Sequence, residues 1–170
     1  MSDLSIPTIV ISFVALLLSL CVHEASHAGA AYVLGDDTAQ QQGRLTLNPK
    51  AHADIIGTVI FPLVGLVFGG FFIGWAKPVP FSPWRLTRKL QVKVSSALIS
   101  FAGPASNVVL ALVAISLVSL AIRLMTDSPA LRVQHLYAAW NGPEHLMRLG
   151  ASPTAVALLG LGGALVQMNV

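Results

Sequence analysis

Apolar residues are gathered into long runs that short polar stretches separate. The first run covers residues 4–22 and keeps helical character to about residue 34, where Gly35 is a typical helix end. A second long run covers residues 94–125, and a third covers residues 153–166. Because a helix needs about 20 apolar residues to cross the bilayer core, the pattern predicts membrane-spanning helices.

A fourth apolar stretch, residues 55–75, contains five glycines and a proline. It predicts either one kinked span or a re-entrant hairpin of two short helices, since both are tolerated where protein covers the backbone. The flanking loops, residues 35–54 and 76–94, contain two and five Lys/Arg residues. If both loops face the cytoplasm, as the positive-inside rule favours, the stretch must re-enter; if it crosses fully, they lie on opposite sides. We favour the first arrangement.

The predicted fold class is an all-α polytopic membrane protein with three to four transmembrane helices, including the re-entrant alternative. A short β element is expected in the first loop, because Gly43–Leu47 has the pattern of an exposed strand. An extended peptide can add to the edge of such a strand. Gly103-Pro104 is expected to interrupt the helix over residues 94–125. We expect one membrane-embedded domain over residues 1–170.

Composition supports lipid as the main solvent of this chain. Hydrophobic residues make up 55% of it and charged residues 10%, whereas soluble domains carry about 25% charged residues. The net charge is +3, and the basic residues cluster between apolar runs. This clustering favours a role of the basic residues in orienting the chain in a membrane over nucleic-acid binding. We expect a multi-pass protein of the cell membrane, which in a bacterium is the cytoplasmic membrane.

Three ionisable residues lie close together within the first apolar run. His23 and His27 are four residues apart, so they share one helix face and can both ligate a zinc ion. Glu24 adjoins the first ligand and can take a proton from a zinc-bound water whose pKa is lowered to about 7. The resulting hydroxide would attack a peptide carbonyl. A proton relay or transporter site is the alternative, because ionisable residues within a membrane need a purpose.

The motif sequences resemble a known family. H-E-A-S-H at residues 23–27 is similar to the active-site motif of the site-2 protease family of intramembrane zinc metalloproteases. Residues 45–58 and 74–80 resemble a compact bacterial subgroup of that family, and A-G-P-A-S-N at residues 102–107 resembles the start of its next core helix. The four segments follow the family order.

The resemblance implies a function and a cofactor. His23 and His27 would bind Zn²⁺, and Glu24 would be the catalytic base. The substrates would be membrane-embedded proteins, cut in or near their transmembrane segments within the lipid bilayer, with no nucleic-acid partner. Neither the substrate nor the oligomeric state is fixed by the sequence.

The family takes its third zinc ligand from an aspartate in a Leu-Asp-Gly-like motif on a later helix. The acidic residues after Gly103 in this sequence are Asp127 and Glu144, and neither is in such a motif. We therefore expect the domain to lack the C-terminal part of the family core. A non-catalytic membrane relative is the alternative function that this departure favours.

Other polar residues are candidates for completing the site. His52 and Asp54 follow the motif helix and could supply a substitute ligand or hold a ligand in place. Their other interpretation is loop structure. Asn107 could hydrogen-bond the substrate or a ligand, or it could satisfy a neighbouring backbone group in helix packing.

Overall fold

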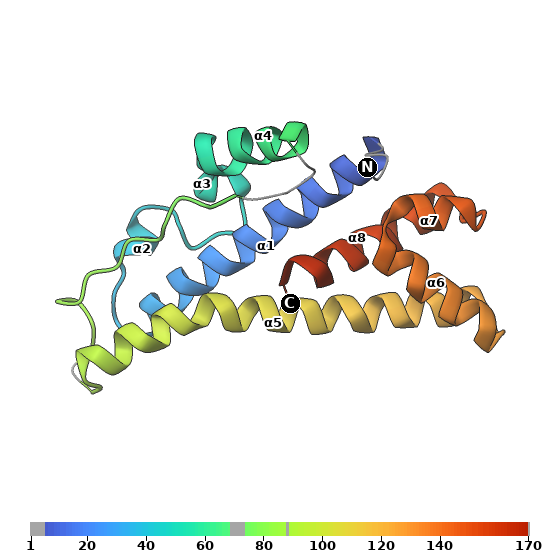
Figure 1. The fold of residues 1–170 in the computed structure, drawn as a ribbon. Coiled ribbons are helices and arrows are strands. Elements are labelled where there is room, and N and C mark those ends of the chain that lie inside the picture. Colours follow the sequence, from blue (N-terminus) through green and yellow to red (C-terminus); the bar gives the residue numbers. More distant parts are fainter. Residues whose placement is uncertain (1–5, 69–73, 88, 170) are drawn as a thin grey trace. The chain divides into compact units, whose positions relative to one another are not determined.

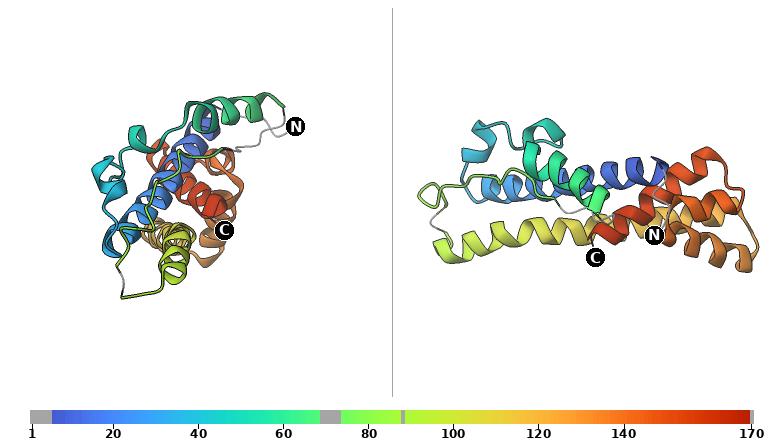
Figure 2. Two further views of the ribbon diagram at one scale, coloured as in Figure 1. Left: turned by 90° about the vertical axis from the view of Figure 1, so that its left-hand side faces the viewer. Right: turned by 45° about the horizontal axis from the view of Figure 1, so that its top comes forward.

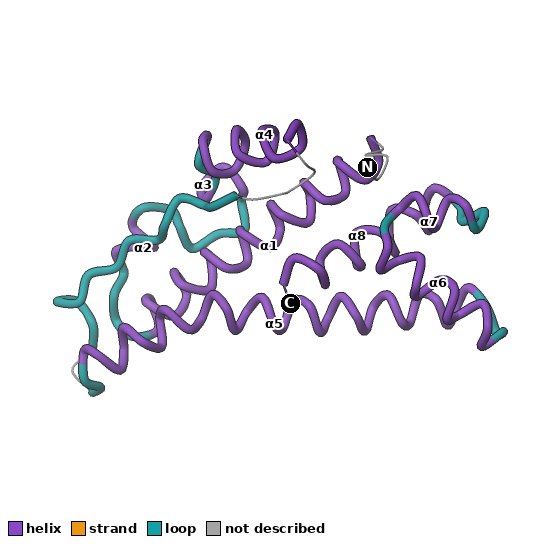
Figure 3. The backbone as a smooth tube through the Cα atoms, viewed as in Figure 1, coloured by secondary structure: helices purple, strands orange, loops and turns teal. Residues whose placement is uncertain are grey.

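The computed structural model describes residues 6–68, 74–87 and 89–169 (Figure 1). Within these ranges the regular structure is helical and no strand occurs (Figure 3), so the all-helical prediction is confirmed there. The chain forms two compact units. We call Leu17–Asn107 the motif unit, and Met1–Leu16 with Val108–Val170 the second unit. The prediction of a single domain stays a prediction.

Among the described residues, two helices are long and apolar enough to cross a bilayer, α1 (Ile6–Val33) and α5 (Val92–Met125). Helix α5 is continuous through Pro104, so the predicted interruption is wrong. The reason is that a proline removes one helical hydrogen bond, and membrane helices tolerate such a loss. Large apolar side chains on α5 are more than half exposed, which is typical of a lipid-facing helix; they include Leu112, Leu117, Leu120 and Leu124.

In the motif unit, the C-terminal part of α1 and the N-terminal part of α5 lie side by side and antiparallel (Figure 2). We call residues 35–54 the first loop and residues 76–94 the basic loop. A buried cluster joins α1, α5 and the basic loop, and it is made by Ala31, Ile99 and Leu86. Four short helices follow α1 along the chain: α2 (Thr38–Gln41), α3 (Pro49–His52), the π-helix η1 (Ile55–Ile60) and α4 (Phe61–Phe68).

The stretch from Ile55 to Trp75, here called the returning stretch, comes back to its own start. The Trp75 amide donates to the Gly57 carbonyl oxygen (3.2 Å), and the Thr58 hydroxyl donates to the Trp75 carbonyl oxygen (2.9 Å). A single span of about 20 helical residues would separate its ends by about 30 Å. The ends therefore meet as in a hairpin, although residues 69–73 between them lie outside the described ranges.

The short β element predicted at Gly43–Leu47 is not confirmed. These residues form turns and bends. The Gly43 and Arg44 amides donate to the carbonyl oxygens of Gln40 and Ala39 (both 2.9 Å), which closes the end of α2. Gly43 has a φ of +67°, in the left-handed region that favours glycine. Local bonds thus replace the strand ladder, and the edge predicted for peptide addition has no strand here.

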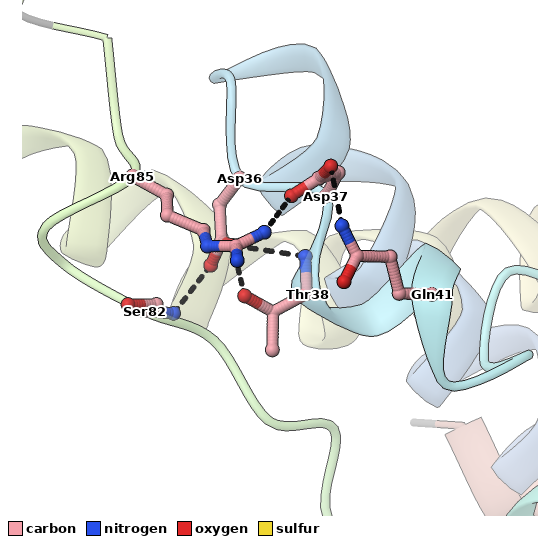
Figure 4. Close-up of polar contacts among 6 residues, drawn as sticks. All are labelled: Asp36, Asp37, Thr38, Gln41, Ser82 and Arg85. Atoms are coloured by element: carbon pink, nitrogen blue, oxygen red, sulfur yellow. Dashed lines mark hydrogen bonds and ion pairs between the residues drawn. The ribbon is translucent and has the colours of Figure 1, made fainter.

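Polar contacts join the first loop to the basic loop (Figure 4). The fully buried Asp36 carboxylate accepts hydrogen bonds from the amides of Thr38 (3.0 Å) and Ser82. Next to it, Asp37 pairs with Arg85, whose hydrogen bond holds the pKa of Asp37 below its ordinary value. Because the two loops are bonded to each other, they must lie on the same side of a membrane that α1 crosses.

The second unit contains three further helices, α6 (Pro129–Asn141), α7 (Pro143–Arg148) and α8 (Pro153–Asn169). The third apolar run, residues 153–166, forms α8, so its predicted helical character is confirmed. Helices α6 and α7 lie in the sequence between the second and third apolar runs. The core of the second unit joins α6, α7 and α8 to the C-terminal part of α5. It is a buried cluster of Val118, Ile122, Ala138, Ala139, Leu146, Val156 and Leu159.

Candidate metal centre

The two motif histidines face each other on α1. Their ring centroids are 4.6 Å apart and the ring planes stand at 80°. Both side chains are partly buried. The four-residue spacing predicted this common face, and α1 runs unbroken through the motif. His23 and His27 can therefore act as a pair.

Gly103 on α5 marks the place where the two imidazoles converge. A Cβ atom built on Gly103 would lie 2.6 Å from His23 Nε2 and closer still to His27 Nε2. Both nitrogens thus face one point beside the glycine backbone, whose missing side chain leaves that point free. A single metal ion held by two imidazoles needs such a point, with about 2.0–2.1 Å to each nitrogen for zinc.

A backbone carbonyl fixes the tautomer of His27. Its Nδ1 lies 2.6 Å from the Ile99 carbonyl oxygen. A carbonyl oxygen only accepts hydrogen bonds, so Nδ1 carries a proton, and in the neutral imidazole Nε2 is then the nitrogen whose lone pair faces Gly103. Metal-binding histidines in proteins are commonly oriented in this way.

Glu24 is held from a different segment. Its Oε2 accepts a hydrogen bond from the Val79 amide (3.1 Å), which lies in the basic loop after the returning stretch. Glu24 therefore sits beside the histidine pair with one oxygen engaged.

His52 and Asp54 make structural contacts. His52 is 1% exposed, and its Nε2 donates to the Thr46 carbonyl oxygen (2.7 Å). Asp54 Oδ1 accepts from the Gly57 amide (2.8 Å) and so caps η1. In these contacts His52 holds the first loop, and Asp54 caps the start of η1. Both contacts agree with the interpretation that these residues structure the loop.

Asn107 lies four residues after Gly103 on α5, one turn further along the same face. Its Oδ1 is buried and has no hydrogen-bond partner. An unsatisfied buried acceptor is costly, so this oxygen is available to a donor from a substrate or ligand.

The residues present fit a zinc ion as two of its ligands. The donor set is two imidazole nitrogens that converge beside Gly103, and the His27 tautomer suits metal binding. Within the described residues, no group of three or more His, Cys, Asp or Glu side chains could hold a metal ion. The third ligand is thus not supplied by such a group.

Sequence reasoning did not foresee the backbone partners of the motif. Any residue type provides the Ile99 carbonyl, so its sequence carries no signal. The Val79 amide had one indirect signal, since it is the single N–H between two prolines. Gly103 belongs to a sequence motif, but its steric role follows only from the position of the two imidazoles in the fold.

Curated bacterial relatives of the chain carry zinc metalloprotease names. The chain is 42% identical over 100 residues to "Putative zinc metalloprotease YwhC" of Bacillus subtilis, covering 59% of this chain and 41% of that protein. It is 34% identical over 102 residues to "Putative zinc metalloprotease Rip2" of Mycolicibacterium smegmatis, covering 59% and 37%. The predicted resemblance to the site-2 protease family is confirmed.

A further relative supports this relationship. The chain is 32% identical over 111 residues to the Rip2 protein of Mycobacterium tuberculosis, covering 65% of this chain and 39% of that protein. The chain thus matches about two fifths of the length of these metalloprotease relatives. No protein-family model matches the chain. No solved structure matches it.

Proposed function

We propose that this chain contains the metal-binding core of an intramembrane zinc metalloprotease, which hydrolyses peptide bonds in or near transmembrane segments. The observation that carries the proposal is the convergence of His23 Nε2 and His27 Nε2 beside Gly103. Two apolar helices of membrane-spanning length carry these residues, and the related proteins are named as zinc metalloproteases.

The chain's own residues account for the orientation of the reacting groups. His27 is held in the metal-binding tautomer by Ile99, and Gly103 keeps the space before both imidazoles open. A bound zinc ion would act as a Lewis acid that acidifies water and polarises the peptide carbonyl. Glu24 is the base: Val79 engages one carboxylate oxygen, and the other takes the proton from water and passes it to the leaving amine.

The experiment is cleavage of a fluorogenic transmembrane reporter peptide by the purified chain in lipid nanodiscs with zinc. We expect the cleavage to disappear on chelation and to fall by about 10²–10⁴ in Glu24→Gln, because general-base catalysis contributes about that factor. Cleavage that survives both treatments would contradict the proposal.

A second candidate function is a membrane relative that binds zinc without cutting. The described residues favour it in one respect, because they offer no group of three metal-binding side chains. Zinc binding that depends on His23, with no Glu24-dependent cleavage, would support it. A proton relay through His27 would have to use Nε2 alone, because Nδ1 bonds to the Ile99 carbonyl.

A further inference from the structure

An extended segment after the returning stretch reaches the catalytic glutamate. We call residues 74–80 the strap. Its backbone amides at every second residue donate toward one side, which is the pattern of an extended chain. These bonds are Trp75 N to Gly57 O (3.2 Å), Lys77 N to His52 O (2.8 Å) and Val79 N to Glu24 Oε2 (3.1 Å).

The prolines of the strap occupy the intervening positions. Pro78 and Pro80 have no amide hydrogen. Because they alternate with the donor residues 75, 77 and 79, their missing amides cost none of these three hydrogen bonds. Each proline also restricts the residue before it to extended backbone, which fixes Lys77 and Val79. Val79 is therefore the single amide donor between residues 78 and 80, and it is directed at Glu24.

Arg44 holds the middle of the strap. Its side chain is buried, with 5% exposure, and Nη1 donates to the carbonyl oxygens of Ala51 (2.5 Å) and Lys77 (3.3 Å). The ion pairs found among the described residues involve Arg85 and Arg132 instead. A buried guanidinium is expensive without strong partners, so its use of two backbone carbonyls indicates a role in joining two chain segments.

We propose that Arg44 is a positioning residue for Glu24. It fixes Lys77 against the first loop, and Lys77 in turn places the Val79 amide, two residues further, on the Glu24 carboxylate. This inference rests on the proposed function, because it concerns the base of that reaction. The segment Gly43–Leu47 thus helps to place the catalytic base, although Arg44 itself bonds to Ala51 and Lys77 and not to the histidines.

The histidines and the glutamate are thus held by separate parts of the motif unit. Ile99 and Gly103 of α5 meet the imidazoles, whereas the strap meets Glu24. Loss of Arg44 should therefore impair catalysis and leave zinc affinity unchanged. A merely structural arginine would change both properties together or neither.

The test compares Arg44→Gln with the control Arg148→Gln, which removes an exposed guanidinium from α7, outside the motif unit. Both variants are labelled with ¹⁵N-valine in nanodiscs, and the Val79 amide is assigned by its loss in Val79→Ala. We expect Val79 hydrogen exchange to become at least roughly tenfold faster in Arg44→Gln, since hydrogen bonds to charged groups are the strong ones. The control should match the parent.

Two further measurements complete the design. Reporter cleavage by Arg44→Gln should show kcat roughly 10- to 100-fold lower with KM unchanged, because misplaced catalytic groups cost about that factor. Zinc affinity, measured by competition with a chelating dye, should stay within about twofold. Arg44→Lys keeps the positive charge on a single donor nitrogen in place of the guanidinium fork. It should give an intermediate exchange rate, and it carries the test if Arg44→Gln does not fold.

The outcomes separate this inference from the proposed function. An unchanged Val79 amide in a folded Arg44 variant overturns the positioning role, whatever the activity. A parallel loss of zinc affinity also overturns it. If the parent chain cuts no reporter, the proposed function fails, while the exchange rates still decide whether Arg44 places Val79 on Glu24.

Discussion

At the scale of single residues, the site depends on an atom that is missing. Gly103 has no Cβ, and the two imidazole nitrogens converge on the position that a Cβ atom there would occupy. The helix would accept a larger residue, since alanine is favoured over glycine in helices by about 1 kcal/mol. The constraint on this position therefore comes from the metal site and not from the helix.

We expect Gly103→Ala to weaken zinc binding by roughly 100-fold or more, a loss at the upper end of those seen when ligand orientation is disturbed. The added methyl group would displace His23 and His27, while the helix content stays the same. Zinc stoichiometry after dialysis, with circular dichroism for the fold, measures both effects.

Gly29→Ala is the matched control. A Cβ atom there would meet Leu45 Cδ1 at 3.8 Å, an ordinary contact. It lies on α1 two residues after His27, and it should bind zinc like the parent. Equal zinc binding by Gly103→Ala and Gly29→Ala would show that the imidazoles do not meet beside Gly103.

At the scale of elements, the returning stretch depends on one buried hydroxyl. Thr58 is 2% exposed; its Oγ1 accepts from the Asp54 amide (3.0 Å) and donates to the Trp75 carbonyl oxygen (2.9 Å). Gly57 beside it allows the Trp75 ring to approach, because a Cβ there would lie 2.5 Å from the ring. These contacts close the hairpin at its base.

Thr58→Val should therefore destabilise the chain by about 1–3 kcal/mol, because it removes the hydrogen-bond partner of two partly buried backbone groups. Thermal unfolding in detergent, followed by tryptophan fluorescence, measures the change. The exposed Thr154→Val is the control and should have little effect. Equal midpoints for the two variants would argue against the hairpin closure.

The elements also show what could be predicted from the sequence. The apolar runs predicted α1, α5 and α8, because hydrophobic length and helix-start residues are local signals. The strand predicted at Gly43–Leu47 is not confirmed, because alternation of apolar and polar residues cannot reveal that local turns satisfy the backbone hydrogen bonds. The His23/His27 pair follows from helical spacing, whereas its partners on α5 and the strap come from tertiary contacts that spacing does not encode.

At the scale of the molecule, the motif unit constrains the topology. The first loop and the basic loop share the Asp36 and Asp37 contacts, and the stretch from Ile55 to Trp75 returns to its start. Both observations support the arrangement in which this stretch re-enters and the two polar loops lie on one side.

Cysteine labelling tests this arrangement. Cys21 is the single cysteine of the sequence, so a Cys21→Ala background permits single-site probes. Gln42→Cys and Trp84→Cys place probes at exposed positions of the two loops. An impermeant maleimide should label both from the same face of membrane vesicles, and inverted vesicles should reverse the result for both. Labelling from opposite faces would rule out the re-entrant arrangement.

The central claim is that His23 and His27 bind one zinc ion. Zinc K-edge X-ray absorption of the zinc-loaded chain tests it most directly, because imidazole ligands give characteristic outer-shell scattering. We predict first-shell nitrogen at about 2.0–2.1 Å with two imidazoles per zinc, and loss of the bound zinc in His23→Ala and His27→Ala. Zinc that stays bound with an unchanged spectrum in both variants would contradict the account.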